Sequence, residues 1–478
     1  MESELDQKNI CLDCVGEDYL KEFIQSKNSS KKCSYCEENN FSVYINEIAL
    51  LFKSALEDHF WQTSDEPSYE ESRLAYEFGD EWYRKGEEIE CIFQDIGEIQ
   101  PEPASDIRSY LEENYNCPRS YKDPYEEPPY CEEAHYNSKS VDDIEYCEEW
   151  SRLEEYIKTN NRFFGIEQTL EKIFDLSNYK EFHKELIIEA GPREKIEYVY
   201  RARVFQSDSM LEKALSNPHL EIGPPPFKES VESRMSAKGV SAFYGAFDVK
   251  TAIAEVRPPV GSNVVVGRFA IEKENRFLNL RAFKGLSQKV DGSIFDKEYL
   301  AKLQHLTFLE RLCDIISRPV MPSDESFEYL ITQSISDFIA YSKKLDLDGI
   351  IYPSVYSGQE KDNVVIFYKS SRMKNPLRHN SKIFVNSMSH DEDGSEIDYH
   401  VFEEYSTDSS TDEMYELPDK SIKSWFLYGQ DDDVRALSLA IDINSLQVHH
   451  INKVSIDSTK HDVTWTKHET RSDEKTEF

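Results

Sequence analysis

The chain has 478 residues, of which 92 are acidic and 55 are basic, so its formal net charge is -37 at neutral pH. This length exceeds what one hydrophobic core usually organises, and we therefore expect two or more domains. A charge of this sign repels a phosphate backbone, and no long basic stripe interrupts it. The composition therefore argues against nucleic acid as a main partner.

The stretch from Met1 to Lys8 has no basic segment followed by an apolar one, which is the pattern of a signal peptide. No apolar run approaches the roughly 20 residues that span a bilayer. We therefore expect a soluble, cytoplasmic protein with no membrane partner. Nine cysteines, an odd number in a long chain, are more typical of reduced thiols than of a disulfide framework.

Four of the cysteines form two C-x-x-C pairs, Cys11 with Cys14 and Cys33 with Cys36, at the spacing of a four-thiolate zinc ribbon or knuckle. The alternative is four unpaired surface thiols, but the paired spacing favours zinc. Four thiolates leave no open coordination position, so the metal would be structural. We predict a zinc-knuckle-like segment over 1–40.

The next region, 41–180, has the apolar spacing of helices and is predicted as a helical module. Its clearest helical faces are formed by Ile45, Ile48, Ala49, Phe52 and Leu56, and by Trp150, Leu153 and Ile157. The stretch from Pro101 to Pro129 is rich in proline, tyrosine and acidic residues, and we expect an irregular connection there.

From 185 to 372, short β-rich runs alternate with helical ones, which predicts a mixed α/β domain and makes the whole chain α+β. Two runs, 264–270 and 363–368, have the pattern of buried strands, and 328–345 has that of an amphipathic helix. The remaining segments are predicted as an acidic flexible insertion over 386–424 and a β-rich extension over 425–467, with a terminal strand pair within 446–456.

Two stretches of the mixed domain carry chemically informative residues. The run from Glu197 to Arg203 is aromatic and β-prone, and it contains Arg201. The run from Gly239 to Arg257 places Tyr244 on a short strand ahead of a helical turn that ends at Glu255. An arginine, a tyrosine and a glutamate in this order indicate a pocket for a ligand with a phosphate, a ring and a cation. NAD has all three.

Each of these residues also has a plainer interpretation when taken alone. Arg201 would then be a surface or ion-paired residue, Tyr244 a core aromatic and Ser354 a turn hydroxyl. Glu255 would be solvated or paired with an arginine. The order and context of the set favour a site. Since the chain has no Gly-rich dinucleotide fingerprint, NAD would be a substrate and not a bound hydride carrier.

The residues from Tyr200 to Phe367 resemble the RES domain, a family of NAD-consuming proteins named for arginine, glutamate and serine and related in fold to ADP-ribosyltransferases. The resemblance rests on five motifs, which are Tyr200-Arg201-Ala202, Ser233-Arg234, Phe243-Tyr244-Gly245-Ala246, Thr251-Ala-Ile-Ala-Glu255-Val256 and Asp348-Gly-Ile-Ile-Tyr-Pro-Ser354. The cysteines and helices before them resemble the HEPN/RES module that precedes some RES domains. The resemblance therefore implies a helical HEPN/RES module followed by an ADP-ribosyltransferase-like RES domain.

The resemblance also implies roles for individual residues. Glu255, Tyr244 and Arg201 would be catalytic, with Glu255 stabilising the positive charge that develops on the ribose, Tyr244 orienting the nicotinamide and Arg201 binding the pyrophosphate. The substrate-binding residues would be Arg234, Ser354 and Tyr200. Met235 and Ser236 follow Arg234 where the family usually has a small residue and an asparagine.

These roles predict an enzyme that cleaves the nicotinamide–ribose bond of NAD by hydrolysis or phosphorolysis, acting as a toxin or defence effector. Two alternatives remain open, an ADP-ribosyltransferase that modifies a protein and a silent nucleotide-sensing protein. The resemblance implies an inhibitory antitoxin-like partner. A homo-oligomer is compatible with the sequence, which does not determine the oligomeric state.

Overall fold

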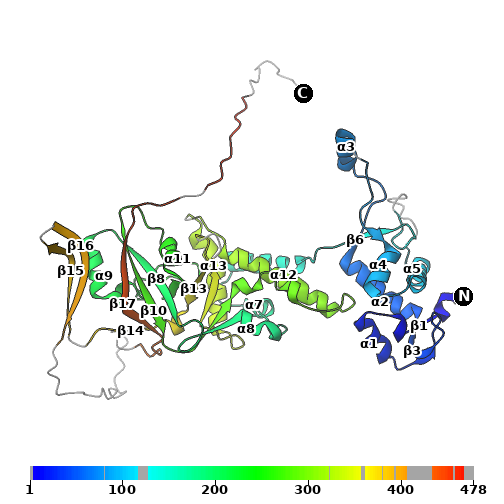
Figure 1. The fold of residues 1–478 in the computed structure, drawn as a ribbon, viewed down its shortest axis with the longest axis horizontal. Coiled ribbons are helices and arrows are strands. Elements are labelled where there is room, and N and C mark those ends of the chain that lie inside the picture. Colours follow the sequence, from blue (N-terminus) through cyan, green and yellow to red (C-terminus); the bar gives the residue numbers. More distant parts are fainter. Residues whose placement is uncertain are drawn as a thin grey trace. The chain divides into compact units, whose positions relative to one another are not determined.

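The computed structural model contains both helices and sheets (Figure 1). The chain divides into two compact units. The residues that it describes are 4–79, 81–116, 127–321, 323–356, 361–378, 381–391, 394–405, 433–455 and 458–467. The first unit comprises Met1–Glu189, Ser230–Val240 and Asn275–Val355. The second comprises Ala190–Glu229, Ser241–Glu274 and Tyr356–Phe478. Each unit is thus built from three separate stretches of chain.

The N-terminal part of the first unit is a small antiparallel sheet with one helix. Strands β1 (Asn9–Cys11), β2 (Ser30–Lys32) and β3 (Asn39–Tyr44) are arranged in the order β1-β3-β2. Helix α1 (Asp18–Ser26) connects β1 to β2, and its N-cap residue Glu17 accepts a hydrogen bond from a backbone N–H of the first turn. These short elements have little apolar area of their own.

The small sheet and the following helices share one hydrophobic core. Helices α2 (Ile45–His59), α4 (Ile89–Gly97) and α5 (Pro101–Tyr115) provide most of it. The same core contains Ile10, Leu20, Ile24 and Val43 from the sheet and α1, together with Ile48, Phe52, Phe93, Ile107 and Leu111 from the helices. The predicted segments 1–40 and 41–180 are therefore packed together in the part of the chain that the structure describes.

Helix α5 corrects the first part of the irregular connection expected over Pro101–Pro129, and residues 117–126 of that stretch lie outside the described part of the chain. Pro101 is the first residue of the helix, where the backbone N–H has no intrahelical partner and the fixed φ of proline suits a helix. Ala104, Ile107 and Leu111 then recur at helical spacing and are fully buried. The density of prolines hid a helix that begins with one.

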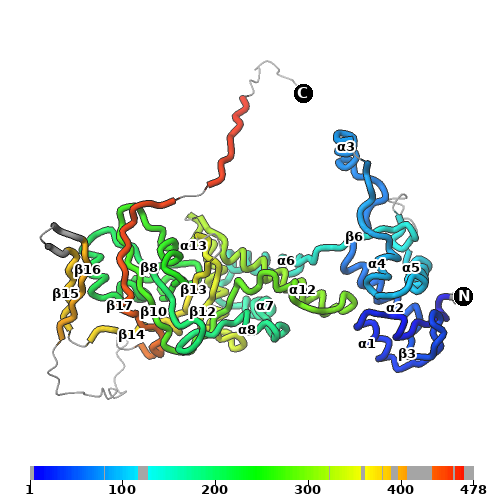
Figure 2. The backbone as a smooth tube through the Cα atoms, in the orientation of Figure 1, coloured from blue at the N-terminus to red at the C-terminus, as the bar shows by residue number. Residues whose placement is uncertain are grey.

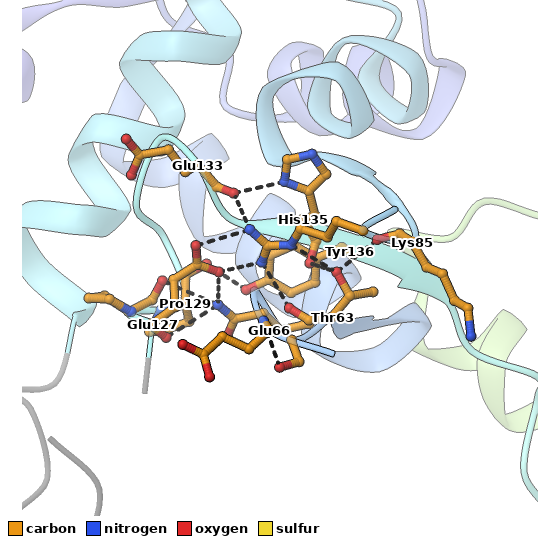
Figure 3. A network of polar contacts seen from close by, with 12 residues as sticks. Thr63, Glu66, Lys85, Glu127, Pro129, Glu133, His135 and Tyr136 are labelled. Atoms are coloured by element: carbon orange, nitrogen blue, oxygen red, sulfur yellow. Dashed lines mark hydrogen bonds and ion pairs between the residues drawn. The ribbon is translucent and has the colours of Figure 1, made fainter. Parts of the chain in front are cut away.

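The partly buried Arg84 lies just before β5 of the sheet formed by β4 (Phe60–Gln62), β5 (Glu87–Glu88) and β6 (His135–Ser138). Figure 3 shows the polar network there, with its partners Thr63 and Glu127 labelled. Arg84 donates two hydrogen bonds to the Glu127 carboxylate, at 3.1 and 2.5 Å. It also donates to the carbonyl oxygen of Thr63, at 2.8 Å. A bidentate pair of this kind has a defined geometry, so it fixes the relative positions of these stretches.

The rest of the first unit is mostly helical. Its helices are α3 (Tyr69–Phe78), α6 (Ile144–Thr159), α7 (Glu167–Ile173), α8 (His183–Leu186), α12 (Lys297–Ser317) and α13 (Glu325–Tyr341). Its strands are neighbours in a sheet in the order β12 (Gly349–Pro353), β11 (Asn275–Asn279) and β7 (Ile187–Ala190). Helix α13 confirms the amphipathic helix predicted at 328–345. No helix within the described ranges has the length and apolar character that a membrane crossing requires.

The second unit is organised around β-strands, which run in the order β14 (Met373–Lys374), β17 (Leu439–His450), β10 (Asn263–Ile271), β8 (Tyr198–Phe205), β9 (Phe243–Ala246) and β13 (Asp362–Ile366). Strands β10 and β13 confirm the buried strands predicted at 264–270 and 363–368. Val264, Val265, Val364 and Val365 are all fully buried. Burial of consecutive valines in both strands explains why each appears in the sequence with an apolar run, Val264–Val266 in β10 and Val364–Ile366 in β13.

Strand β17 replaces the terminal strand pair that the sequence predicts within 446–456. It is one long strand that runs beside β10 (Figure 2). The two strands are antiparallel, with Val264 opposite His449 and Ile271 opposite Leu439. Residues 451–455 are not part of any strand. The apolar residues near the C-terminus therefore complete a sheet begun far earlier in the chain, and local pattern alone could not identify that partner.

The predicted acidic insertion at 386–424 begins inside a β-hairpin. Strands β15 (Lys382–Asp391) and β16 (Gly394–Glu404) pair antiparallel, with Phe384 opposite Phe402. The apolar residues of Ile383–Val385 and Val401–Phe402 provide this strand character, which the acidic composition obscures. Residues 406–432, which include the rest of the insertion and the start of the predicted extension at 425–467, lie outside the described part of the chain.

Among its described residues, the second unit also contains the α-helices α9 (Asp208–Ser216), α10 (Pro218–Glu221) and α11 (Val249–Glu255). Helix α11 packs against β8, β9, β10 and β13. Its Ala252 belongs to a buried cluster with Ala202, Ala246, Val264 and Val266. The Asp248 carboxylate caps the helix and accepts hydrogen bonds from the backbone N–H of Thr251, at 3.0 Å, and from its hydroxyl, at 2.7 Å. Small side chains and a defined cap hold α11 close to the sheet.

Replacing Asp248 with alanine should lower the free energy of unfolding by about 0.5–2 kcal/mol at neutral pH, because the first turn loses its cap. Burial raises the pKa of Asp248, but the hydrogen bonds from Thr251 outweigh it, and the pKa lies below its ordinary value of 3.8. The stabilisation is therefore complete above about pH 4 and is lost as the pH falls further. Urea titrations at several pH values measure it, with Asp248→Asn as the control that keeps an acceptor without titrating. Equal stability of the wild type and Asp248→Ala at neutral pH would contradict this role.

Candidate functional site

Neighbouring strands of the second unit hold two of the predicted catalytic residues, Arg201 on β8 and Tyr244 on β9. A glycine allows these strands to approach. A Cβ atom at Gly245 would lie 3.0 Å from the carbonyl oxygen of Tyr200 and 2.8 Å from the ring of Phe243. Both distances are too short for a side chain, so the Tyr-Gly sequence belongs to the packing of this site.

The register of the strands determines which side chains share a face. Tyr200 and Asn363 both lie opposite Ala246, which packs beneath α11. Tyr244 is two residues before Ala246, so alternation places it on the same face as α11. Arg201 follows Tyr200 in the strand, so its side chain projects from the opposite face of the sheet. The sheet thus separates Arg201 from the face that carries Tyr244 and α11.

The Arg201 guanidinium has one nitrogen, Nη1, that makes no hydrogen bond to the described residues. Its guanidinium carbon lies 5.1 Å from the centre of the Phe243 ring, on a face where Phe243 also packs against Phe269. The Nη1 atom is buried and has no hydrogen-bond partner among the described residues. A buried cationic nitrogen left in this state is costly, and an anion would remove that cost.

The environment of Arg201 changes its acidity. Burial lowers the pKa of Arg201 to about 10, and repulsion from Arg203 acts in the same direction. The Tyr244 oxygen opposes the shift, so the phenol is within electrostatic range of the guanidinium although it is on the other face. At neutral pH the guanidinium remains charged, because its pKa is still well above 7.

Glu255, the third predicted catalytic residue, is the last residue of α11 and is held by an asparagine. Asn363 Nδ2 donates a hydrogen bond to Glu255 Oε1 at 2.7 Å. Asn363 is on β13 and is 2% exposed. The carboxylate is therefore fixed over the sheet face that also carries Tyr244. Asn363 lies at the start of a run predicted from the sequence as a buried strand, and the sequence motifs assign it no role in the site.

The position of Glu255 at a helix end is not explained by helix stability. Arg257, with φ 45°, and Pro258 end the helix, since the residue before a proline disfavours the helical conformation. A carboxylate at a helix C-terminus is repelled by the nearby carbonyl dipoles, at a cost on the order of 0.3–1 kcal/mol. The donor from Asn363 compensates for this repulsion, which makes the pair a candidate functional feature.

Tyr200 borders a separate polar cavity of about 320 Å³ at the start of α11, where Val249 also lines it. The cavity contains an ion pair of 2.6 Å between Arg268 and Asp442. The start and end of a seven-residue helix are about 9 Å apart, at 1.5 Å per residue. Tyr200 therefore faces a different part of the surface from Glu255, and its substrate-binding role stays a prediction.

Arg234, a predicted substrate-binding residue, belongs to the first unit and donates hydrogen bonds at the C-terminal end of α12. Its Nη1 donates to the carbonyl oxygens of Ile316 and Arg318, the latter at 2.7 Å, where α12 ends. These carbonyls have no partner within the helix, and a cation there is favourable to the helix dipole. The structure therefore gives Arg234 a helix-capping contact, and binding of a pyrophosphate by Arg234 stays a prediction.

Ser354, the remaining substrate-binding prediction, directly follows β12 in the first unit and is fully buried. A buried serine at the end of a strand is suited to hydrogen bonding. The second unit thus carries Arg201, Tyr244, Glu255 and Tyr200, and the first unit carries Arg234 and Ser354. Phe243 belongs to one of the motifs and Asn363 to a predicted strand, but neither of them was assigned a role in the site from the sequence.

The four predicted metal ligands come together in the first unit. The sulfur atoms of Cys11, Cys14, Cys33 and Cys36 lie within 4.8 Å of one another. The contacts between them measure 3.5–3.7 Å. Zinc–sulfur bonds of about 2.3 Å in a tetrahedron place the sulfurs about 3.8 Å apart, whereas a disulfide requires about 2.05 Å. The cluster could therefore hold a metal ion, and its chemistry suits zinc.

The backbone around Cys33 also fits a thiolate ligand. The N–H of Tyr35 donates to the Cys33 sulfur at 3.4 Å. Burial raises the pKa of Cys33, but backbone N–H donors outweigh this effect and bring the pKa down to about 7. Donors aimed at sulfur are typical of the second shell of a metal site.

The purified protein should contain one zinc ion per chain, and Cys33→Ser should reduce that content, because a tetrahedral site loses one of its four ligands. Chelation should unfold the shared N-terminal core, since binding of a structural metal supplies folding free energy. Elemental analysis and protease sensitivity of residues 4–115 measure the two effects. Cys91→Ser is the matched control, because Cys91 is exposed and outside the cluster. A metal-free protein with the same protease resistance would show that the thiols need no ion.

A comparison with known protein families found a match to the region that contains this site. Residues 199–380 match the family model described as RES domain, which supports a RES domain in this part of the chain. The matched range includes Arg201, Tyr244, Glu255 and Asn363. RES domains belong to a class of NAD-related toxins and effectors. No curated protein matches the chain.

Proposed function

We propose that the chain is an enzyme that cleaves the bond between nicotinamide and ribose in NAD. The observation that carries the proposal is the Glu255 carboxylate, which is held by Asn363 at 2.7 Å on the sheet face that also carries Tyr244. A fixed carboxylate on the same sheet face as a phenol, within a region that matches the RES domain, suits a reaction in which a sugar becomes positively charged.

In this reaction the bond from ribose C1 to the nicotinamide nitrogen breaks, and its electron pair returns to the pyridinium ring. A water or phosphate oxygen then bonds to C1, and a water molecule releases its proton to solvent. Glu255 stabilises the positive charge on the ribose while the bond is broken. Tyr244 offers an aromatic face to the cationic nicotinamide ring. No step requires another cofactor.

Arg201 has a separate role in the proposal. Its buried Nη1 has no partner among the described residues, and its charge persists at neutral pH. A diphosphate would supply the missing anion with bidentate geometry. Because the side chain leaves the opposite face from Tyr244, we assign Arg201 to substrate binding and not to bond cleavage. Loss of this contact should raise KM more than it lowers kcat.

Glu255→Gln should lower nicotinamide release from NAD by about 100-fold or more, because an amide cannot stabilise a developing cation as a carboxylate does. Chromatographic measurement of nicotinamide, with and without phosphate, gives the rate. Glu274→Gln is the matched control, because Glu274 is an exposed glutamate of the same unit. An unchanged rate in Glu255→Gln would remove the mechanism.

The same assay distinguishes the fates of ADP-ribose. Free ADP-ribose indicates hydrolysis, ADP-ribose phosphorylated at the anomeric carbon indicates phosphorolysis, and labelled protein indicates transfer to a side chain. Absence of nicotinamide release with all of these acceptors would refute the proposed activity and favour a protein that only senses the nucleotide.

A further inference from the structure

Asn363 is the second residue of β13, where a partly buried Asp362 precedes it and three apolar residues follow. Val364, Val365 and Ile366 follow it on β13 and are fully buried. Asn363 itself is 2% exposed, and its Oδ1 atom is buried without a hydrogen-bond partner among the described residues. The amide is therefore anchored through Nδ2, which donates to the Glu255 carboxylate.

This arrangement is unfavourable for folding alone. A buried carbonyl oxygen without a donor loses its hydration and gains nothing in return. Asparagine is also a poor strand residue compared with the valines that follow it. An aliphatic residue at 363 would remove the unsatisfied oxygen and suit the strand better. The amide is therefore best explained by what it does to the carboxylate.

The contact controls where the carboxylate lies. Glu255 has three rotatable side-chain bonds and sits at the end of a short helix, with the proline-ended turn beyond it. A hydrogen bond from a buried, packed side chain selects one of the available positions. The donor comes from β13, which is adjacent to the strand β9 that carries Tyr244. The hydrogen bond therefore holds the carboxylate on the same sheet face as the phenol.

We propose that Asn363 is a positioning residue that holds the Glu255 carboxylate in the orientation needed for cleavage of the nicotinamide–ribose bond. This inference rests on the proposed function only for the identity of the reaction. The claim that Asn363 sets the position of the Glu255 carboxylate does not depend on it. A purely structural alternative is that the hydrogen bond only attaches α11 to β13. The two explanations differ in what happens when the donor is replaced by an apolar group of similar size.

The experiment compares Asn363→Val, which removes the donor, with Asn363→Thr, which retains a hydroxyl donor in a side chain of similar size. Positioning predicts that Asn363→Val lowers kcat by about 10-fold to 100-fold with little change in KM, while its melting temperature is unchanged or higher. Asn363→Thr should recover part of kcat. In a Glu255→Gln background, Asn363→Val should cause no further loss, since the two residues act as a unit.

The matched control is Asn275→Val, because Asn275 is also a buried strand asparagine whose amide atoms have no partner among the described residues. It should leave kcat unchanged. A structural attachment would instead lower the melting temperature of Asn363→Val and leave kcat per folded molecule intact, and that result overturns the proposal. So would an additive loss in the Glu255→Gln background.

A crystal structure of Asn363→Val provides a measurement independent of activity. Movement of the Glu255 carboxylate away from its wild-type position supports the inference, and an unmoved carboxylate overturns it. If the wild type releases no nicotinamide while the carboxylate still moves, the assignment of NAD as substrate fails and the positioning of Glu255 by Asn363 stands. The two failures are thus distinguishable.

Discussion

The hydrogen bond between Asn363 and Glu255 is the contact on which the interpretation of the site depends. Each partner is locally unfavourable, because one is an amide in a buried apolar strand and the other an anion at a helix C-terminus. Together they offset part of each other's cost, since a charge-assisted hydrogen bond is among the stronger polar contacts. Locally unfavourable features that persist in a packed sheet are characteristic of sites selected for function.

The first unit solves a different physical problem. Strands of three to six residues and a nine-residue helix cannot bury enough apolar surface to fold alone. The N-terminal elements gain stability by sharing a core with α2, α4 and α5, and the four thiols add a cross-link if they hold an ion. Arg84 and Glu127 attach the later chain through a bidentate contact whose cost of burial is limited by partial exposure.

Sequence reasoning succeeded where the signal was local. Paired cysteines, the apolar runs of β10 and β13 and the helical spacing of α13 each lie within a short window, and all were identified. It failed where a distant partner decides the structure, as for β17, and where composition obscured pattern, as for α5 and the hairpin. The elements that carry Arg201, Tyr244 and Glu255 were predicted from motifs. Asn363 was not, because its importance arises only when β13 lies next to β9 and α11 lies above them.

The pairing of β17 with β10 determines which C-terminal boundary a recombinant fragment of this domain can have. The match to the RES family ends at residue 380, yet the strand that covers one side of β10 begins at Leu439. A recombinant fragment trimmed to the family boundary would leave the backbone amides and carbonyls along that side of β10 open to any extended peptide. Such a fragment would be prone to self-association through its exposed margin, and a soluble product must retain the chain through His450.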